Sequence, residues 1–489
     1  MPLGGKMPDL RPVLYIVGSL LIGLGALMLI PAAVDIMTGF FGWPIFIISG
    51  VATSSAGGLL LFAFQPKGRT SLGTREGFLV TALSWIILCG FGSLPFILGD
   101  RLSFTNAFFE AMSGLTTTGS TVITNLNEQA PGILLWRAIL QWIGGIGIII
   151  VAVAVLPFLR VGGMHLFRTE SSDRSDKIRP RVTQIAGILL LVYVVLTFIC
   201  IILLRLAGMP SFDAICHAMA ILATGGFSTK DASIGFYQSP AIEWIASLFM
   251  LLGGTTFALM ARLLLMRDPK PLLRDSQMRW YLLVFATFTL AMVLWQFAIN
   301  QRGFADSLRA SVFAVSSILT TTGLVAEDYT LWGSLPVAAM MILLFIGGCT
   351  GSTSGGIKIF RICILSSFAT WQIRSLVHPH RILLPTYNHQ KVSDDVVRSV
   401  ISFVSFYILS FAVLGIGAAA FGLDLVTAFS GVAQALGNVG PGLGTIIGPA
   451  GNFASLPDGA KWIMSFAMLL GRLELMTLLV LFSPGFWRG

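Results

Sequence analysis

Long apolar stretches without Asp, Glu, Lys or Arg alternate with short polar segments along the whole chain of 489 residues. A helix needs about 20 apolar residues to cross the hydrocarbon core of a bilayer, so the pattern predicts ten transmembrane helices. In the tenth, Arg472 and Glu474 interrupt an otherwise apolar stretch. The predicted spans cover residues 12–34, 36–66, 77–99, 138–159, 182–204, 244–261, 280–301, 329–357, 399–423 and 462–484.

Four shorter apolar segments lie between successive spans, at residues 104–117, 211–224, 308–321 and 425–438. Each has about 14 residues and would be about 21 Å long as a helix, which is too short to cross the membrane. A helix lying flat at the membrane interface is one interpretation of such a segment. We favour a re-entrant helix, because a glycine-containing motif directly follows each segment.

The four short segments align without a gap when one glycine of each following motif is superimposed. Leucine stands four positions before that glycine every time, and a small residue stands twelve positions before it. A second glycine recurs in the next span, so a unit of span, short helix, glycine turn and span repeats about every hundred residues. The first glycines are Gly119, Gly226, Gly323 and Gly440, and the second glycines are Gly144, Gly253, Gly347 and Gly471.

We therefore predict an all-α polytopic membrane protein in which four pseudo-repeats surround one pore. It would have ten transmembrane helices, including two extra helices at the N-terminus, and four re-entrant pore helices. The predicted units are an N-terminal helix pair (1–70), a first pore repeat (71–160), a second (161–267), a third with an intramembrane loop (268–375) and a fourth (376–489).

The composition narrows the class of protein. Hydrophobic residues make up 55% of the chain and charged residues 11%, against roughly a quarter charged residues in soluble domains. This composition excludes a soluble enzyme, a nucleic-acid-binding protein and a disordered protein, and it makes membrane lipid the expected surroundings. The five cysteines are scattered and form no C-x-x-C pair, so the sequence predicts neither a disulfide framework nor a zinc site.

The net charge of +9 reflects the membrane topology. With the N-terminus inside, most of the 31 Lys and Arg residues fall on one side, among them those of the basic segments 160–181 and 358–398. The positive-inside rule then places both termini in the cytoplasm. Glu110 and Arg137 fall on the outer side, where Glu110 is either a solvated charge or a means of concentrating cations near the pore.

The glycine turns have the chemistry of a cation filter. Non-helical backbone at membrane depth is tolerated where it is buried or lines a water-filled cavity, and glycine permits conformations in which carbonyl oxygens face inward. Four such turns around an axis would offer rings of carbonyl oxygens that replace the hydration shell of a monovalent cation. The C-terminal ends of the short helices would add a partial negative charge that also favours cations.

These motifs resemble those of the Trk/Ktr/HKT superfamily of potassium transporters, and specifically its TrkH-type membrane subunits. Any single motif is weak, but together they are specific, and the resemblance covers essentially the whole chain. The segments that carry it are TTTGST at 116–121, HAMAILATGGFST at 217–229, TTTGL at 320–324, GGCTGSTSGGIKIFR at 347–361, LGNVGPGLG at 436–444 and LLGRLELMTLL at 469–479.

The resemblance implies potassium uptake across a bacterial inner membrane by a homodimer in which each protomer has its own pore. It also implies a cytoplasmic, nucleotide-binding TrkA-type subunit that gates the pore, potassium as the bound and transported ion, and no other cofactor in this chain. Either Gly225 or Gly226 would be the filter glycine of the second repeat. By position, the selectivity filter would comprise Thr117, Thr118, Gly119, Thr224, Gly225, Gly226, Thr321, Thr322, Gly323, Asn438, Val439 and Gly440.

The segment 347–356 interrupts a predicted span with five glycines: Gly347, Gly348, Gly351, Gly355 and Gly356. A loosely packed helix contact through small residues is one interpretation. The other, to which TrkH-type proteins are similar, is a flexible loop that closes the pore beneath the filter. Because Arg472 costs about 2.5–3.5 kcal/mol at the centre of a membrane helix, we expect it either to face the pore and help hold this gate loop or to form a salt bridge with another helix.

The sequence therefore predicts a channel-like potassium uptake protein. We do not expect an enzyme, because the predicted spans contain neither a pair of catalytic groups nor a metal cluster. The alternative is a secondary transporter that moves potassium together with protons or sodium, since broken helices and internal repeats are common to such proteins. All four predicted units have the same orientation, which favours a ring around a pore over an inverted pair.

Overall fold

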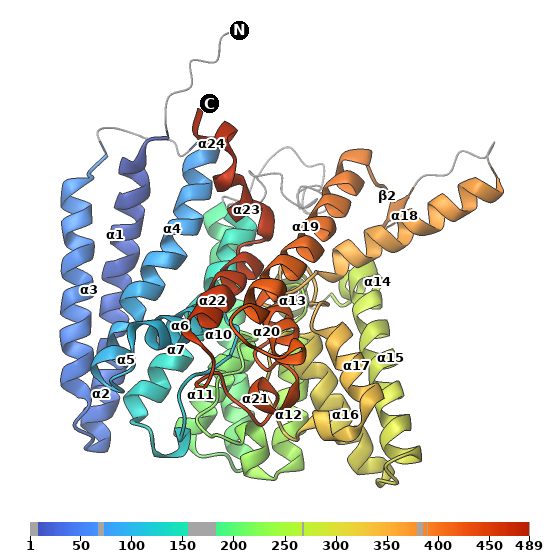
Figure 1. Ribbon diagram of the computed structural model, residues 1–489, viewed down its shortest axis with the longest axis horizontal. Helices are drawn as coiled ribbons and strands as arrows, with labels where there is room; N and C mark the ends of the chain where they lie inside the picture. Colours follow the sequence, from blue (N-terminus) through green and yellow to red (C-terminus); the bar gives the residue numbers. More distant parts are fainter. Residues whose placement is uncertain are drawn as a thin grey trace.

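The computed structural model describes residues 8–66, 73–154, 182–266, 268–378, 385–388 and 390–488. These residues form helices and one short β-hairpin (Figure 1). The basic segment 160–181, which we assign to the cytoplasm from its sequence, lies outside the described residues.

Two long helices, connected by a short one, form a pair at the N-terminal edge of the molecule (Figure 1). They are α1 (Leu10–Leu27), α2 (Leu29–Thr38) and α3 (Trp43–Ala63). Glycines set the close packing of α1 on α3: a Cβ atom added to Gly18 would lie 2.8 Å from the Gly57 carbonyl oxygen, and one added to Gly25 would lie 2.7 Å from that of Gly50. Small residues allow this approach in lipid, where apolar surface alone gives little drive for association.

The rest of the chain forms four successive groups of helices. The first comprises α4 (Thr74–Gly92), α5 (Leu94–Leu98), α6 (Phe104–Leu115), η1 (Leu126–Glu128) and α7 (Pro131–Ala154). The second comprises α10 (Val182–Leu206), α11 (Ser211–Leu222), η3 (Ser233–Tyr237), α12 (Pro240–Gly253) and α13 (Phe257–Met266). The third comprises α14 (Lys270–Arg274), α15 (Ser276–Ala298), α16 (Phe304–Leu319), η4 (Tyr329–Trp332), α17 (Ser334–Leu343) and α18 (Ile359–Val377). The fourth comprises β1 (Thr386–Tyr387), β2 (Gln390–Lys391), α19 (Asp394–Ala419), α20 (Leu425–Gly437), α21 (Gly444–Ile447), α22 (Asp458–Arg472), α23 (Leu475–Leu479), η5 (Val480–Phe482) and α24 (Pro484–Arg488).

The four short segments predicted between the spans form helices α6, α11, α16 and α20, which lie inside the molecule (Figure 1). Most residues of each helix are buried, including polar ones such as Glu110 and His217. A helix lying flat at the membrane interface would leave one polar face in water. The observed burial therefore contradicts the interfacial interpretation of these segments.

Seven described helices are long and apolar enough to cross a membrane, and the number rises to nine if each of two bent pairs counts as one span. The chain bends by 106° between α12 and α13, and by 112° between α22 and the segment that begins with α23. In the third group, the ten-residue helix α17 is followed by an irregular loop that continues to α18. The predicted spans 244–261 and 462–484 are therefore broken, and not continuous helices as their composition suggested, whereas the interruption of the span 329–357 was predicted from its glycines.

Each break falls at the second glycine of its repeat, which is Gly253, Gly347 or Gly471. Glycine lowers helix stability by about 1 kcal/mol relative to alanine, so these positions are weak points in a span. The freed backbone groups find partners in one another: Cys349 N donates to Gly254 O at 2.8 Å. This pairing brings two of the breaks together inside the molecule, where unpaired backbone would be costly.

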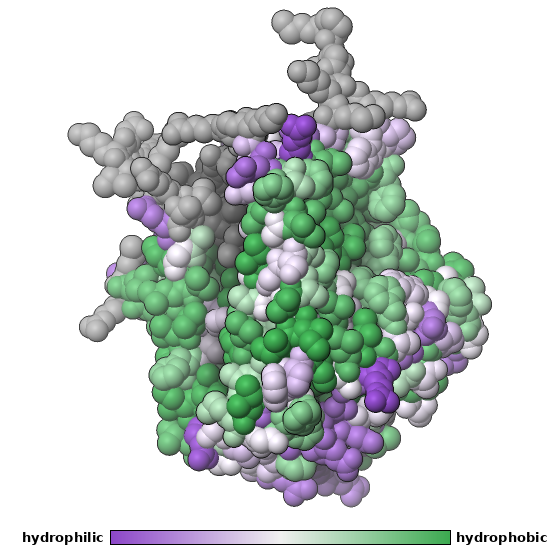
Figure 2. Space-filling model, turned by 90° about the vertical axis from the view of Figure 1, so that its left-hand side faces the viewer, coloured by the Kyte–Doolittle hydropathy of each residue, from purple (hydrophilic) through white to green (hydrophobic). Residues whose placement is uncertain are grey.

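One face of the molecular surface is apolar across its middle (Figure 2). Figure 2 shows a broad band of hydrophobic residues on one side of the molecule, with hydrophilic residues gathered toward its lower end. The start of α1 and helix α24 lie at the same end of the molecule (Figure 1), where Val13 and Phe486 belong to one hydrophobic cluster. Both ends of the described chain therefore lie on the same side, as an even number of membrane crossings requires.

Candidate functional site

The turns that follow α6, α11, α16 and α20 share one backbone conformation. Each contains a non-glycine residue in the left-handed region, and a glycine with positive φ stands two positions later. The first residues are Thr117 (φ 53°), Thr224 (51°), Thr321 (57°) and Asn438 (53°), and the glycines are Gly119 (93°), Gly226 (78°), Gly323 (78°) and Gly440 (109°). Non-glycine residues rarely have positive φ, so this pattern indicates one turn repeated four times. Its register aligns Gly226, and not Gly225, with the other three glycines.

The four turns close into a ring. A Cβ atom added to each of these glycines would collide with the carbonyl oxygen of the residue that precedes the equivalent glycine in the next repeat. The contacts run from Gly119 to Gly225 O, from Gly226 to Thr322 O, from Gly323 to Val439 O and from Gly440 to Thr118 O. The order is cyclic, so the structure brings all four predicted filter segments together and leaves no room for a side chain at the glycines.

Threonine hydroxyl groups connect the residues of the turns. Thr116 Oγ1 lies 2.8 Å from Thr118 Oγ1, and the equivalent atoms of Thr320 and Thr322 lie 2.7 Å apart. Asn438 Nδ2 donates to Thr118 Oγ1 at 3.0 Å and thereby links the fourth turn to the first. Because buried hydroxyl groups need partners, these contacts fix the conformation of the turns.

Two glutamines that the sequence did not single out also contact the turns. Gln141 of α7 donates from Nε2 to Gly225 O at 2.5 Å and accepts from Phe227 N at 3.0 Å. Gln434 of α20 accepts from Gly440 N at 3.2 Å. The only sequence signal for either residue is an amide in an otherwise apolar stretch, which does not reveal the backbone group it binds.

The glycine segment 347–356 packs directly against the ring. Gly355 N donates to Thr321 Oγ1 at 2.7 Å, and Thr353 Oγ1 lies 3.2 Å from Thr224 Oγ1. The backbone between α17 and α18 is irregular, so a loosely packed helix contact does not describe it. The loop thus contacts the left-handed residues of two turns.

Arg472 joins this loop to the first repeat. The guanidinium is buried and donates from Nη1 to Thr353 O at 2.6 Å and from Nη2 to Gly144 O at 3.0 Å. Within the part of the chain that the structure describes, no carboxylate lies within 4.0 Å of Arg472, so the alternative of a salt bridge is not realised there. Two charge-assisted hydrogen bonds to backbone carbonyl groups hold the arginine instead.

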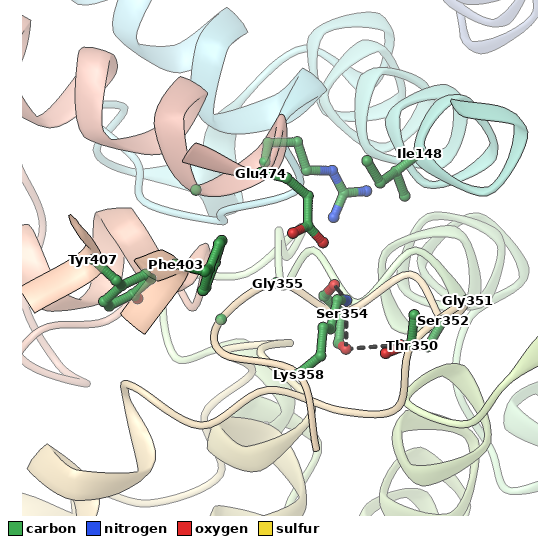
Figure 3. Close-up of a pocket in the computed structure, with 13 residues that line it drawn as sticks. Ile148, Thr350, Gly351, Ser352, Ser354, Gly355, Lys358, Phe403, Tyr407 and Glu474 are labelled. Carbon is green, nitrogen blue, oxygen red and sulfur yellow. Dashed lines mark hydrogen bonds between the residues drawn. The ribbon is translucent and has the colours of Figure 1, made fainter. Parts of the chain in front are cut away.

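A cavity lies against the same loop (Figure 3), lined in part by Ser354, Lys358, Arg472 and Glu474. Lys358 Nζ donates to Ser354 O, and Glu474 forms an ion pair with Arg361. Because Glu474 is neutralised by Arg361, Arg472 leaves the cavity with an excess of positive charge. This charge disfavours a cation in the cavity.

Glu110 is not a solvated charge at an outer mouth, nor does it face water to concentrate cations. It is fully buried and forms an ion pair with Arg137, whose Nε lies 2.8 Å from Oε1. The arginine lies within α7 and not in an outer loop. Each charge is buried because the other neutralises it, and the two residues are too far apart in sequence for a local pattern to show the pairing.

The oxygen atoms at the ring come from backbone carbonyl and threonine hydroxyl groups. Among the described residues, no group of three or more His, Cys, Asp or Glu is placed to hold a metal ion. Neutral oxygens are suited to a weakly hydrated monovalent cation that must bind and then leave.

Comparison with known proteins gives concordant results. The sequence pattern of the TrkH family, described as a cation transport protein, matches residues 43–488. The Trk system potassium uptake protein TrkI of Halomonas elongata is 44% identical over 484 residues, which cover 98% of this chain and 97% of TrkI. The Trk system potassium uptake protein TrkH of Salmonella typhimurium is 39% identical over 484 residues, with 98% and 99% covered.

A solved structure is similar over the same length. The crystal structure of the potassium transporter TrkH from Vibrio parahaemolyticus aligns with a TM-score of 0.90 at 36% identity, covering 98% of this chain and 100% of that chain. The similarity therefore includes the four turns, the glycine loop and the helices that hold them. The chain belongs to the TrkH family of cation transport proteins, which are transporters and not enzymes.

Proposed function

We propose that this protein takes up potassium ions across the inner membrane of a bacterium through a channel-like pore. The ring closed by Gly119, Gly226, Gly323 and Gly440 carries the proposal, because four equivalent turns around one axis offer oxygen atoms to one ion from all sides. The relatives named Trk system potassium uptake proteins support potassium as the ion.

The four turns form the proposed selectivity filter. Their oxygen atoms would replace the hydration shell of potassium, which is the transported substrate and not a resident cofactor. The C-terminal ends of α6, α11, α16 and α20 run into the turns and would add partial negative charge. The equivalent backbone conformations support Gly226 as the filter glycine of the second repeat.

The gate is assigned to the loop 347–356 together with Arg472. The contacts of Gly355 with Thr321 and of Thr353 with Thr224 support a loop that closes the pore next to the filter. Opening would require the loop to leave these partners, and the glycines at 351 and 356, with φ of 79° and 64°, permit large backbone changes there.

The proposed assembly is a homodimer with one pore per protomer, in which four pseudo-repeats follow the N-terminal helix pair. Ten crossings result if α17 with its loop counts as a broken span beside the nine by length and composition. A cytoplasmic, nucleotide-binding TrkA-type subunit would regulate the gate. Helix α18 could connect such a subunit to the gate, because it begins directly after the loop and extends away from the body of the molecule (Figure 1).

Ion flux in vesicles tests the function. Purified protein is reconstituted into liposomes with a potassium gradient, without sodium and with a protonophore that collapses any proton gradient. We expect potassium flux to persist and the current to reverse at the potassium equilibrium potential. Potassium flux that stops under these conditions, and returns only when a proton or sodium gradient is restored, would support the coupled symporter instead.

A further inference from the structure

A buried ion pair lies beside the first two turns of the ring. Arg137 Nε of α7 is 2.8 Å from Glu110 Oε1 of α6, and the two side chains are 1% and 0% exposed. Neither residue belongs to the filter segments or to the loop 347–356. Their other contacts show what the pair holds.

Glu110 holds the backbone that leaves the first turn. Its carboxylate accepts from Thr121 Oγ1 at 2.9 Å and from Val122 N at 2.9 Å, and both residues closely follow Gly119. A carboxylate that accepts from a guanidinium, a hydroxyl and a backbone amide is fixed in orientation. The position of the first turn is thereby tied to the position of Glu110.

Arg137 holds the corresponding backbone of the second repeat. Its Nη1 donates to Ser228 O at 2.8 Å, and its guanidinium carbon lies 4.0 Å from the centroid of the Phe227 ring. Phe227 and Ser228 directly follow Gly226. Because the planar guanidinium binds several partners in a fixed geometry, Arg137 sets the distance between the first and second turns through Glu110.

Gln141 strengthens the same arrangement. It lies four residues after Arg137, so the two side chains project from one face of α7. Gln141 contacts Gly225 O and Phe227 N, whereas Arg137 contacts Ser228 O. Together they bind the second turn on both sides of its glycine.

The four repeats differ at the position of Glu110. The residue nine positions before the ring glycine is Glu110, His217, Ala314 or Gly431 in repeats one to four. His217 Nε2 lies 2.9 Å from Ser228 Oγ and therefore contacts the residue that Arg137 holds. The third and fourth repeats have no charged residue at this position. An ion pair that involves this position is therefore confined to the corner between the first and second turns.

Stability alone does not explain such a pair. Desolvation of two buried charges offsets much of their attraction, and apolar residues of similar volume are often as stable. An ion pair instead fixes geometry, because its hydrogen bonds set the relative positions of the groups that they join.

We propose that Glu110 and Arg137 are positioning residues for ion selectivity. They hold the corner between the first and second turns at the spacing that binds dehydrated potassium in preference to sodium. This inference rests on the proposed filter function of the ring.

The test is the ratio of potassium to sodium permeability, measured from reversal potentials in liposomes. The variants are Arg137→Gln, Arg137→Lys and the double variant Glu110→Gln with Arg137→Gln. We expect the ratio to fall about tenfold in Arg137→Gln and in the double variant, as the loss of one charge-assisted hydrogen bond allows. Arg137→Lys keeps the positive charge but loses the planar guanidinium with its several donors. Its permeability ratio should therefore lie between those of Arg137→Gln and the wild-type protein.

Arg302 and Glu327 provide the matched control. They form an ion pair with a distance of 2.6 Å, but their side chains are 28% and 33% exposed. Replacing both with Gln should leave the permeability ratio unchanged. The double variant of Glu110 and Arg137 leaves no unpaired buried charge, and Arg137→Lys keeps the ion pair, so folded protein is expected even if Arg137→Gln is unstable.

The outcomes separate this inference from the proposed filter. A purely structural role would lower the yield or the melting temperature of these variants without changing their permeability ratio, and that result would overturn the inference. Gly323→Ser, measured alongside, tests the ring itself. If Gly323→Ser lowers the ratio and the pair variants do not, only the positioning role fails; if none of them lowers it, the filter assignment fails too.

Discussion

At the residue scale, each ring glycine meets two constraints, a positive φ and the lack of space for a side chain. A substitution would violate both. Gly323 has φ of 78°, a conformation that costs a side-chain-bearing residue roughly 1–2 kcal/mol. In addition, a Cβ atom there would collide with Val439 O. Gly208, with φ of 99°, meets only the first constraint, because nothing lies within 4 Å of its added Cβ. Comparing these two glycines separates ring geometry from backbone strain.

Asp100, between α5 and α6, gives a prediction about pH at the same scale. Burial, and then the charge of Glu110, raise the pKa of Asp100 to about 6 from 3.8, although Arg137 opposes the shift. A raised folded-state pKa means that the folded protein binds this proton more tightly, so stability falls as pH rises from about 4 to about 6 and is level above that.

Asp100→Asn should remove this dependence. We expect a gain of roughly 1–2 kcal/mol at pH 8 and no gain at pH 4, after allowance for partial solvent screening. Thermal unfolding in detergent from pH 4 to pH 8 measures both. Parallel curves for the wild-type protein and the variant would show that Asp100 does not cause the dependence.

At the scale of elements, the sequence predicted the short helices and the interruption at 347–356, but not the breaks after α12 and α22. The helices α6, α11, α16 and α20 are near their predicted bounds, because a 14-residue apolar run can neither cross the membrane nor remain in water. A straight span and one bent by 106° bury the same apolar residues, so hydropathy does not distinguish them. The recurring second glycine marked the positions of the breaks without revealing their direction.

The candidate site, too, could be predicted from the sequence only in part. The repeated Thr-Gly motifs predicted which segments meet, because the alignment of the repeats is itself visible in sequence. The contacts of Gln141, of Gln434 with Ser120 Oγ, and of Glu110 with Arg137 could not be predicted, since each joins groups far apart in the chain. Arg472 was noticed because a charge in an apolar span is costly, but its backbone partners depend on the fold of the loop 347–356.

The contacts of the loop lead to a prediction for Arg472. Arg472→Ala removes the hydrogen bonds to Thr353 O and Gly144 O and should favour the open loop. We expect potassium flux to rise about tenfold, because a charge-assisted hydrogen bond contributes roughly 1.5–3 kcal/mol to the state that contains it.

Tracer uptake of rubidium into liposomes measures the change. Arg205→Ala is the control, because Arg205 donates only weakly, at 3.4 Å, to Met209 O near the end of its own helix. Flux that is unchanged in a folded Arg472 variant would rule out its role in holding the gate.

At the scale of the whole molecule, Asp35 joins the N-terminal helix pair to the first of the four groups of helices. This buried carboxylate of α2 accepts from Gly132 N, at the start of α7, at 2.7 Å. A negative charge at a helix N-terminus is favourable by up to about 2 kcal/mol when partly buried. The contact therefore joins two units that are otherwise separate along the chain.

Asp35→Ala should lower the stability of the folded protein by roughly 1–2 kcal/mol and expose α2 and α3 to protease. Thermal unfolding and limited proteolysis in detergent measure the two effects. Asp458→Ala is the control, since the Asp458 side chain is 67% exposed and its removal should change stability by less than about 0.5 kcal/mol. Equal losses in the two variants would show that Asp35 is not a specific attachment point.

The central claim is that the ring of four glycine turns selects potassium, and its most direct test is the reversal potential under mixed potassium and sodium gradients. Wild-type protein, Gly323→Ser and Gly208→Ser are compared in the same liposomes. The account predicts a reversal potential near that of potassium for the wild-type protein and Gly208→Ser, and a clear shift toward that of sodium for Gly323→Ser. An unchanged reversal potential in Gly323→Ser, or an equal shift in Gly208→Ser, would contradict it.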